Sequence, residues 1–403
     1  TESREGKTMF RNKLSQSILS MLLVLAFQSS TVLAADADIE REFDVAANGT
    51  LTIESDAGEI DVETWSQNQV HIVVHDPDGF EVEFDQSGND VTVVADSRGS
   101  FFGLRRSNIS FTVQVPVRYN VDLNTGGGKI TVSDISGEVE VDTSGGSIDI
   151  GVVSGGDVNA DTSGGSITIE QVDGDVFADT SGGNITVGNV TGSVEVDTSG
   201  GRILIANVSG DISADTSGGN IEVGEGGGSV DLDTSGGSIR AGWAEGPLSA
   251  ETSGGNITLA GGSSRVSADT SGGNITIEGG SGSVLADTSG GNITIRNVTG
   301  EVSADTSGGR IELDLSSVTD SSGGDVSLDT AGGDITVRLP ANLGATIDAV
   351  LNTSRRGRGS YRIFTDFPLS IREEDDQIIG SGDINGGGYD IELETTNSDI
   401  HII

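Results

Sequence analysis

A short polar phrase that returns on a nearly constant spacing is the feature that most constrains how this chain can fold. The phrase reads SADTSGGNITI at Ser267–Ile277 and LADTSGGNITI at Leu285–Ile295. Its threonine recurs every 18 residues, with a single step of 19, at Thr125, Thr143, Thr162, Thr180, Thr198, Thr216, Thr234, Thr252, Thr270, Thr288 and Thr306. A further copy follows at Thr330 after an insertion of six residues. A period of this length, kept over so many units, predicts a solenoid in which each repeat is one coil packed on its neighbours.

Within one unit the apolar residues alternate as they do in β-strands. Val284, Ala286 and Thr288 fall on one face of a short strand, and Ile293 and Ile295 resume the inward face after two glycines. The apolar stretches are rich in valine, isoleucine and threonine, which favour strands, and the chain holds 62 glycines against five prolines. We therefore expect an all-β fold, a single-stranded parallel β-helix (β-solenoid) with about 18 residues per coil and degenerate capping coils at both ends.

The expected coil has two short strands and a cramped third side. Parallel connections favour a right-handed winding, and the strand spacing of about 4.8 Å gives twelve coils a length of roughly 55–60 Å. Glycines are expected at the corners, where the backbone needs positive φ or close approach. The Asp, Thr and Ser side chains of the phrase are expected to bond to backbone amides that the turn leaves unpaired.

The aspartate of the phrase creates a second pattern, because equivalent coils would place ten carboxylates in one column. They are Asp142, Asp161, Asp179, Asp197, Asp215, Asp233, Glu251, Asp269, Asp287 and Asp305. Each neighbouring pair costs about 0.9 kcal/mol even at the dielectric constant of water, so something must offset the repulsion. One hypothesis is that each carboxylate caps its own turn and salt screens the rest. The other is that Ca²⁺ or another hard cation bridges successive carboxylates, although the nonapeptide pattern of calcium-binding β-rolls is missing.

The chain is expected to divide into five segments. An apolar stretch behind Arg11 and Lys13 is typical of a secretory signal peptide and is too short to span a bilayer. Degenerate copies of the phrase occur at both ends, SDAGEI from Ser55 and TTNSDIHII from Thr395, as capping coils require. The predicted segments are an upstream non-native start at 1–8, a signal peptide at 9–34, an N-terminal β region or cap at 36–120, the regular solenoid at 121–338 and a C-terminal β cap at 339–403.

The signal peptide and the charge bear on location and partners. Export predicts a soluble protein of the periplasm, the cell surface or the cell exterior, and neither a cysteine nor a second apolar stretch of spanning length follows the signal. The chain has 63 acidic and 21 basic residues, for a net charge of −42. Such a charge argues against nucleic acid as a partner and favours cations or basic partners.

Three motifs, in their order along the chain, resemble a known family. They are GEIDVETWSQNQVHIVV at Gly58–Val74, the DTSGGNITI coils, and a tail containing FTDFPLSI and GSGDINGGGYDIELETTNSDIHI. They are similar to the bacterial "putative adhesin" family of β-strand-repeat proteins, a domain of unknown function found in many envelope proteins. The resemblance covers nearly all of residues 40–403 and implies a parallel β-helix, export to the envelope and no established enzymatic activity. It carries no catalytic residues over to this chain.

Few side chains outside the repeats suggest chemistry. His71 and His75 are four residues apart on a strand, about 13 Å, and cannot share a metal ion. Two arginine clusters are better candidates for binding an acidic glycan or a phosphate-bearing partner. They are Arg105 with Arg106, and Arg355 with Arg356 and Arg358, with the aromatic residues Phe101, Phe102 and Tyr361 nearby to stack on sugars. Alternatively, the arginines neutralise the acidic ends of the protein itself.

The sequence therefore predicts an exported, non-enzymatic β-solenoid with a structural or adhesive role at the bacterial cell envelope. Its partner would be a cell-surface, glycan or protein ligand, and no cofactor is expected. A calcium- or cation-stabilised envelope protein is the first alternative. A β-helix enzyme acting on acidic polysaccharide is the second, although no pair of carboxylates stands out as an acid/base dyad.

Overall fold

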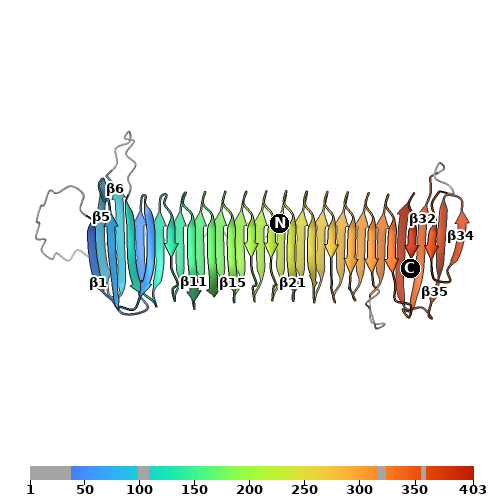
Figure 1. The fold of residues 1–403 in the computed structure, drawn as a ribbon, viewed down its shortest axis with the longest axis horizontal. Coiled ribbons are helices and arrows are strands. Elements are labelled where there is room, and N and C mark those ends of the chain that lie inside the picture. Colours follow the sequence, from blue (N-terminus) through green and yellow to red (C-terminus); the bar gives the residue numbers. More distant parts are fainter. Residues whose placement is uncertain (1–37, 99–108, 316–323, 355–359) are drawn as a thin grey trace, which may run out of the picture. The chain divides into compact units, whose positions relative to one another are not determined.

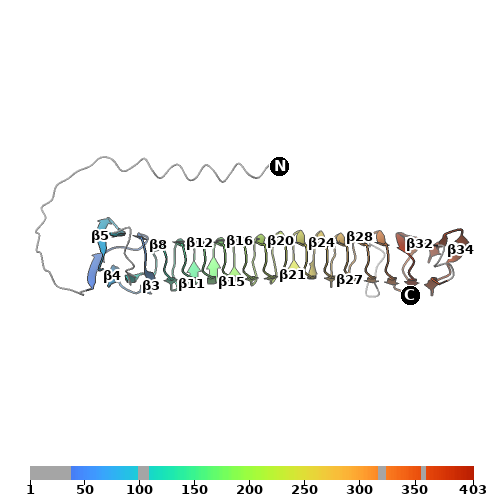
Figure 2. The same ribbon diagram turned by 90° about the horizontal axis from the view of Figure 1, so that it is seen from above.

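The computed structural model describes residues 38–98, 109–315, 324–354 and 360–403, and residues 38–403 form one compact unit. Each regular coil gives one strand to each of two parallel sheets, which face each other as two layers (Figures 1 and 2). Sheet B holds the strands that end at the threonine of the phrase: β8(Asn120–Thr125), β10(Val139–Thr143), β12(Val158–Thr162), β14(Val176–Thr180), β16(Val194–Thr198), β18(Ile212–Thr216), β20(Val230–Thr234), β22(Leu248–Thr252), β24(Val266–Thr270), β26(Val284–Thr288), β28(Val302–Thr306) and β30(Val326–Thr330). This confirms the expected β-solenoid.

Sheet A holds the strands that follow the two glycines. They are β9(Ile130–Val132), β11(Ile148–Ser154), β13(Ile167–Asp173), β15(Ile185–Val190), β17(Ile203–Ile205), β19(Ile221–Val223), β21(Ile239–Ala244), β23(Ile257–Gly262), β25(Ile275–Ile277), β27(Ile293–Arg296), β29(Ile311–Asp314) and β31(Ile335–Arg338). Equivalent residues pair directly, so that Thr270 lies beside Thr288 and Ile275 beside Ile293. On the short third side some coils pair over two or three residues, as Val152 to Ser154 do with Gln171 to Asp173, and others have a single parallel bridge, such as Val190 to Val208.

The core is the narrow space between the two sheets. In β26, Val284, Ala286 and Thr288 are buried while Leu285 and Asp287 point outward, and Ile293 and Ile295 of β27 are fully buried. The same alternation in each coil stacks equivalent apolar side chains into one continuous core. A two-residue period with one buried face is what half-buried strands require, so the alternation in the sequence is confirmed.

Threonine closes the corner between the two sheets. The Thr288 hydroxyl donates to the carbonyl of Gly273 in the preceding coil at 2.9 Å and accepts from the amide of Gly291 in its own coil at 3.2 Å. The same pair of bonds recurs at Thr162, Thr180, Thr198, Thr216, Thr234, Thr252, Thr270, Thr306 and Thr330. The expected bonding of the phrase's side chains to the turn backbone is thus confirmed for threonine, whereas capping of the turn by the neighbouring aspartate stays a hypothesis.

The second glycine of the phrase is fixed by the approach of the next coil. A Cβ atom on Gly291 would lie 1.7 Å from the carbonyl oxygen of Gly273, closer than any real contact, whereas the nearest atom to a Cβ on Gly290 would be 3.7 Å away. Neither Gly273 nor Gly291 has a positive φ. Close approach, rather than a left-handed backbone, is therefore the reason for glycine at this position.

The N-terminal strands form the first coil of the stack and cover its outer side. They are β1(Ile39–Asp44), β2(Thr50–Ser55), β3(Glu59–Trp65), β4(Gln69–His75), β5(Phe80–Ser87), β6(Asp90–Ser97) and β7(Ser110–Pro116). Strands β2 and β3 form a coil that pairs in parallel with β8 and β9, and β6 and β7 pair on its outer side. Ser55 lies beside Thr125, as expected if SDAGEI is a degenerate copy of the phrase. Antiparallel pairing of β5 with β6, and of β1 and β7 with β4, completes this end.

The C-terminal strands turn back into the stack. They are β32(Ala345–Asn352), β33(Ile363–Thr365), β34(Ser370–Glu374), β35(Gln377–Ile384), β36(Tyr389–Thr396) and β37(Ile400–Ile402). Strands β36 and β37 form the coil next to β30 and β31, while β32 and β33 pair on the far side of that coil. The hairpin β34–β35 adds two antiparallel strands beyond β32. The last coil in the sequence is thus not the last coil in space.

Candidate functional site

The carboxylates of the phrase form one column on the outer face of sheet B. Residues from Asp142 to Asp305 pair with their equivalents in direct register, which confirms the expected alignment. The column continues through Asp329 to Glu394 at one end and through Asn124 to Glu54 at the other. We call this array the acidic column. It runs along sheet B from β2 near the N-terminal end to β36 near the C-terminal end.

Sheet B carries no compensating charge along the column. The other outward position of these strands holds further acids, such as Glu140, Glu195 and Asp231, or uncharged residues such as Phe177 and Leu285. Neither lysine nor arginine occurs in β2, in β36 or in the twelve regular strands of sheet B as the structure describes them. On these strands the outer face of sheet B therefore carries acidic and uncharged side chains and no basic one.

Five carboxyl groups of the acidic column have raised pKa values. Partial burial between coils, and then the charges of Asp179 and Asp142, raise the pKa of Asp161. Burial, followed by the charges of Asp233 and Asp197, raises the pKa of Asp215 in the same way. The carboxyl pKa values of Asp269, Asp305 and Asp329 are also raised, with burial as the main cause. Both burial and the like charges of neighbouring coils disfavour the ionised form of these carboxyl groups, so the ionised column destabilises the fold.

The acidic column does not gather into a metal-binding cluster. Among the residues that the structure describes, no group of three or more His, Cys, Asp or Glu side chains is placed to hold a metal ion. Each coil contributes one carboxylate from this column, whereas a calcium site usually takes six to eight oxygen ligands. The bridging of successive carboxylates by Ca²⁺ remains a proposal without a built site.

Other polar columns bond to backbone amides of the next coil. The side chain of Asp157 accepts from the amide of Asp175 at 2.9 Å, and Asp211 accepts from the amide of Ser229 at 2.7 Å. The bond to the Ser229 amide lowers the pKa of Asp211. The asparagine of GGN acts likewise, as when Asn274 accepts from the amide of Asn292 at 2.8 Å. The signal in the sequence was the 18-residue recurrence of Asp, Asn or Ser before most of the regular strands.

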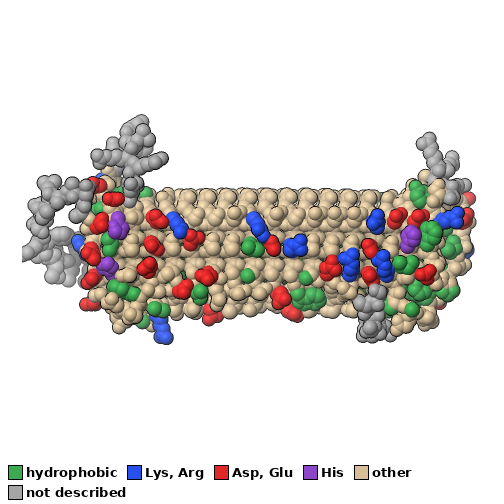
Figure 3. All heavy atoms as spheres, in the orientation of Figure 1, with side chains coloured by type: hydrophobic (Ala, Val, Ile, Leu, Met, Phe, Trp, Pro, Cys, Tyr) green, Lys and Arg blue, Asp and Glu red, His purple; other side chains and the backbone are tan. Residues whose placement is uncertain are grey.

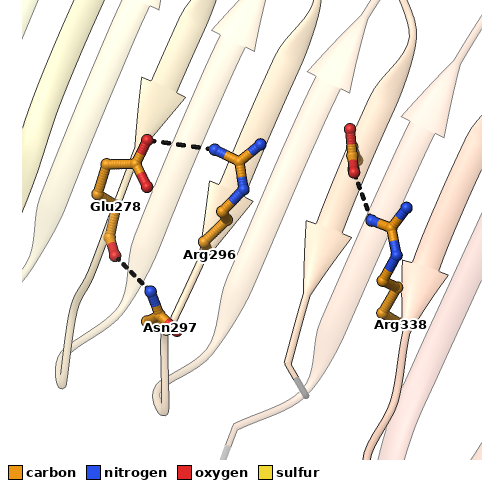
Figure 4. A network of polar contacts seen from close by, with 5 residues as sticks. Glu278, Arg296, Asn297 and Arg338 are labelled. Atoms are coloured by element: carbon orange, nitrogen blue, oxygen red, sulfur yellow. Dashed lines mark hydrogen bonds and ion pairs between the residues drawn. The ribbon is translucent and has the colours of Figure 1, made fainter. Parts of the chain in front are cut away.

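Sheet A presents a different face, on which acids and bases are mixed (Figure 3). Lys129 pairs with Asp149 at 2.8 Å, and Arg296 pairs with Glu278 at 3.2 Å (Figure 4). Two further pairs join Arg202 to Glu222 and Arg338 to Glu312. Most of these pairs link side chains of neighbouring coils. The cations of the regular coils thus lie on sheet A or at the edges, and four of them are paired with acids.

The predicted arginine clusters fall outside the described residues. Arg105, Arg106, Arg355, Arg356 and Arg358, and with them Phe101 and Phe102, belong to the two segments 99–108 and 355–359. Their proposed role in ligand binding stays a prediction. Just beyond the second segment, the ring of Tyr361 packs against the core and Arg362 donates its backbone amide to Asp399 at 2.8 Å.

The histidines are strand-surface residues. His71 Nε2 lies 2.8 Å from Glu40 and His75 Nδ1 lies 2.9 Å from Asp38, so both rings link β4 to the segment that begins β1. His401 stacks on Phe364, with ring centroids 4.7 Å apart. The three rings are held by separate partners.

Comparison with known proteins adds a family. The model of the Toastrack family DUF4097, a domain of unknown function, matches residues 48–278. No curated protein matches. In the described residues no helix is long and apolar enough to cross a membrane.

Several solved structures are similar at low identity. One is a putative cell adhesion protein from Clostridium sporogenes ATCC 15579, at 8% identity over 91% of this chain and 98% of that one, with a TM-score of 0.20. A putative adhesin from Bacteroides fragilis NCTC 9343 is 15% identical over 65% and 97%, with a TM-score of 0.23. A putative lipid binding protein from Parabacteroides distasonis ATCC 8503 is 13% identical over 74% and 96%, with a TM-score of 0.18. The family model covers more than half of the chain, so this protein belongs to the Toastrack DUF4097 family, in agreement with the family resemblance of the sequence motifs.

Proposed function

We propose that this protein is an exported, non-enzymatic β-solenoid with a structural or adhesive role at the bacterial cell envelope. The observation that carries the proposal is the pair of long sheet faces, which keep the same residue columns in register over twelve regular coils. A surface of this kind makes many equivalent contacts along one direction, which suits an extended partner better than a single small substrate.

The two faces suit different partners. The outer face of sheet B, whose regular strands carry acids and no basic residue, favours a basic protein segment or cations and opposes anionic lipid or polysaccharide. The face of sheet A, where acids and bases are mixed, also presents a row of hydroxyl groups on adjacent strands, such as those of Thr258, Thr276 and Thr294. Contact with a cell-surface protein or glycan is therefore the form of adhesion that we propose.

Cell fractionation and envelope binding test this proposal together. We expect the protein in the periplasm, at the surface or in the medium, and we expect purified protein to bind envelope fractions of its own host. Replacing Asp197, Asp215 and Asp233 by Asn should weaken binding several-fold if the partner is basic. The matched control replaces the exposed Asp76, Asp78 and Asp96 by Asn, which removes the same charge at the N-terminal end of the molecule, several coils away from Asp197, Asp215 and Asp233. A cytosolic location, or no envelope binding by the unmodified protein, would refute the proposal.

The in-register carboxylates favour one alternative, a protein stabilised by cations along the acidic column. Thermal unfolding in EDTA, in millimolar calcium, and in sodium chloride of matched ionic strength separates the two ideas. A rise in Tm that only calcium produces would support bridging by the cation. An equal rise in sodium chloride would assign the effect to general screening of like charges.

A further inference from the structure

The C-terminal coil, formed by β36 and β37, lies inside the stack although it comes last in the sequence. Strand β36 pairs in parallel with β30 over five residues on one side and with β32 over eight residues on the other. Strand β37 pairs in parallel with β31 and with β33, over three residues each. In both ribbon views the label C stands short of the end of the solenoid, with β34 beyond it (Figures 1 and 2). Both strands of this coil therefore have a parallel neighbour on each side.

The C-terminal coil stays bonded as far as Ile403, whereas terminal residues of domains are usually poorly ordered unless they are tied down. The amide of Ile403 donates to the carbonyl of Val337 at 3.0 Å, and its carbonyl accepts from the amide of Leu339 at 2.8 Å. On the outer side, the carbonyl of Ile402 accepts from the amide of Asp366 at 3.0 Å. The end of β37 is thus held by the coils on both sides.

Side chains fix the same coil at its corner and in the core. The Thr395 hydroxyl donates to the carbonyl of Gly333 at 2.8 Å, as the threonines of the regular coils do. The amide of Asp399 donates to the carboxylate of Asp334 on the inner side at 3.0 Å, and its own carboxylate accepts from the amide of Arg362 on the outer side at 2.8 Å. Every second side chain of β36 and β37 is buried in the core.

The strands on the outer side determine how this coil can leave the stack. While β32, β33, β34 and β35 stay folded, they block its movement outward along the axis of the solenoid. The coil must then be withdrawn within its own plane, which strains the hydrogen bonds to both neighbours at once. By contrast, β34 pairs with β35 as the outermost strand of the described part of sheet B and can peel away one bond after another. Because bonds strained together resist a pull better than bonds broken in turn, the C-terminal coil should resist far better than β34.

The N-terminal end shows the same insertion of a coil. Strands β2 and β3 lie between β8 and β9 on one side and β6 and β7 on the other, and all four pairings are parallel. The two ends have different sequences and are closed by different hairpins, β5–β6 in one and β34–β35 in the other. Insertion of a coil between two parallel neighbours is therefore a property of both ends.

We propose that the C-terminal coil is a mechanical lock, which lets the solenoid carry tension between Ile403 and a partner bound on the sheet faces without unravelling. A solenoid unravels from an open end, because each coil contacts mainly its neighbours. Every regular coil that is released, 18 residues, lengthens the chain by about 60 Å and leaves the next coil open. Holding the C-terminal coil from both sides opposes this process at its first step. The inference rests on the proposed adhesive function, since the tension arises from a bound partner.

Single-molecule pulling on the full mature protein tests the lock. The chain contains no cysteine, so one cysteine in place of the exposed Ser235 and one added after Ile403 attach two handles at defined positions. The control keeps the first handle and moves the second to Glu374 on the exposed strand β34. We expect the first rupture to need a several-fold higher force when the protein is pulled from Ile403 than when it is pulled from Glu374. An equal or lower force at Ile403 would overturn the lock.

Two matched substitutions locate the resistance. Thr395→Val removes the bond to Gly333 and should lower the first rupture force measured from Ile403. Thr252→Val removes the equivalent bond to Gly237 in a central coil and should leave that force unchanged. Equal effects of the two substitutions would contradict the lock.

Hydrogen exchange of the unmodified protein keeps the lock testable if Thr395→Val does not fold. The amides of β36 and β37 should exchange as slowly as those of the central strands β24 and β25, and the faster exchange of a frayed end would overturn the lock. Failure of the lock and failure of the proposed function are distinguishable. Envelope binding by a protein whose C-terminal coil is released at low force would refute the lock alone. A strong lock in a protein that binds no envelope fraction would refute the adhesive role alone.

Discussion

At the scale of single residues, replacing the first or the second glycine of the phrase by alanine should change the free energy of unfolding by very different amounts. A Cβ on Gly237 would lie 1.8 Å from the carbonyl oxygen of Gly219, while on Gly236 it would lie 3.7 Å from the nearest atom. Gly237→Ala must force two coils apart, and we expect it to lower the free energy of unfolding by about 3 kcal/mol or more. Gly236→Ala should change it by less than about 1 kcal/mol. Denaturant unfolding of the two variants measures both, and equal effects would contradict the role assigned to close approach.

The sequence predicts much at this scale, but not which side chain closes the corner. Asp287 and Thr288 are neighbours, and both residue types can bond to backbone amides in turns. The alternation assigns Thr288 to the buried face and Asp287 to the outer one, and the buried hydroxyl is the one that reaches Gly273. The column of carboxylates was predictable because it follows from the period alone. The hydrogen-bonding partner was not, because it depends on how closely successive coils approach.

At the scale of the strand, Asp211 and Asp215 lie four residues apart in one coil and should respond to pH in opposite ways. Burial and like charges raise the pKa of Asp215 above its ordinary value of about 3.9, so the stability that it contributes is fully present below that value and is lost as the pH rises through the raised pKa. The Ser229 amide lowers the pKa of Asp211, so its contribution is present above the ordinary value and is lost as the pH falls through the lowered one.

The directions of these two pKa shifts predict how the Tm of two isosteric variants depends on pH. Asp215→Asn should raise Tm at pH 7 and have little effect near pH 4, because the repulsion that it removes exists only when the column is ionised. Asp211→Asn should lower Tm at pH 7, because the charged acceptor of the Ser229 amide is lost. Thermal unfolding from pH 4 to 7, in low and in high salt, checks both. A rise in Tm for Asp211→Asn at pH 7 would contradict the assigned bond.

The order and pairing of the strands at the ends of the sheets could not be predicted from the repeat. The 18-residue period implies that coils adjacent in sequence are adjacent in space, yet Thr330 pairs with Thr395 across the whole segment that forms β32 to β35. Such long-range pairing leaves no local periodicity. The degenerate copies at Ser55 and Thr395 did indicate that both termini belong to the stack. Their places inside it follow from the need to cover the last open coils with antiparallel strands.

At the scale of the whole molecule, stability should depend on the number of intact coils rather than on any single one, because each coil contacts mainly its neighbours. Deleting residues 217–234 removes one full coil and joins Thr216 to Ser235, so that β18 would pair with β22 in unchanged register. We expect this protein to fold cooperatively with only a modestly lower Tm. Deleting residues 217–225, half a coil, would direct a sheet B strand into sheet A and expose its buried face, and that protein should not fold. Circular dichroism and thermal unfolding distinguish the two, and equal damage from both deletions would show that the coils are not interchangeable units.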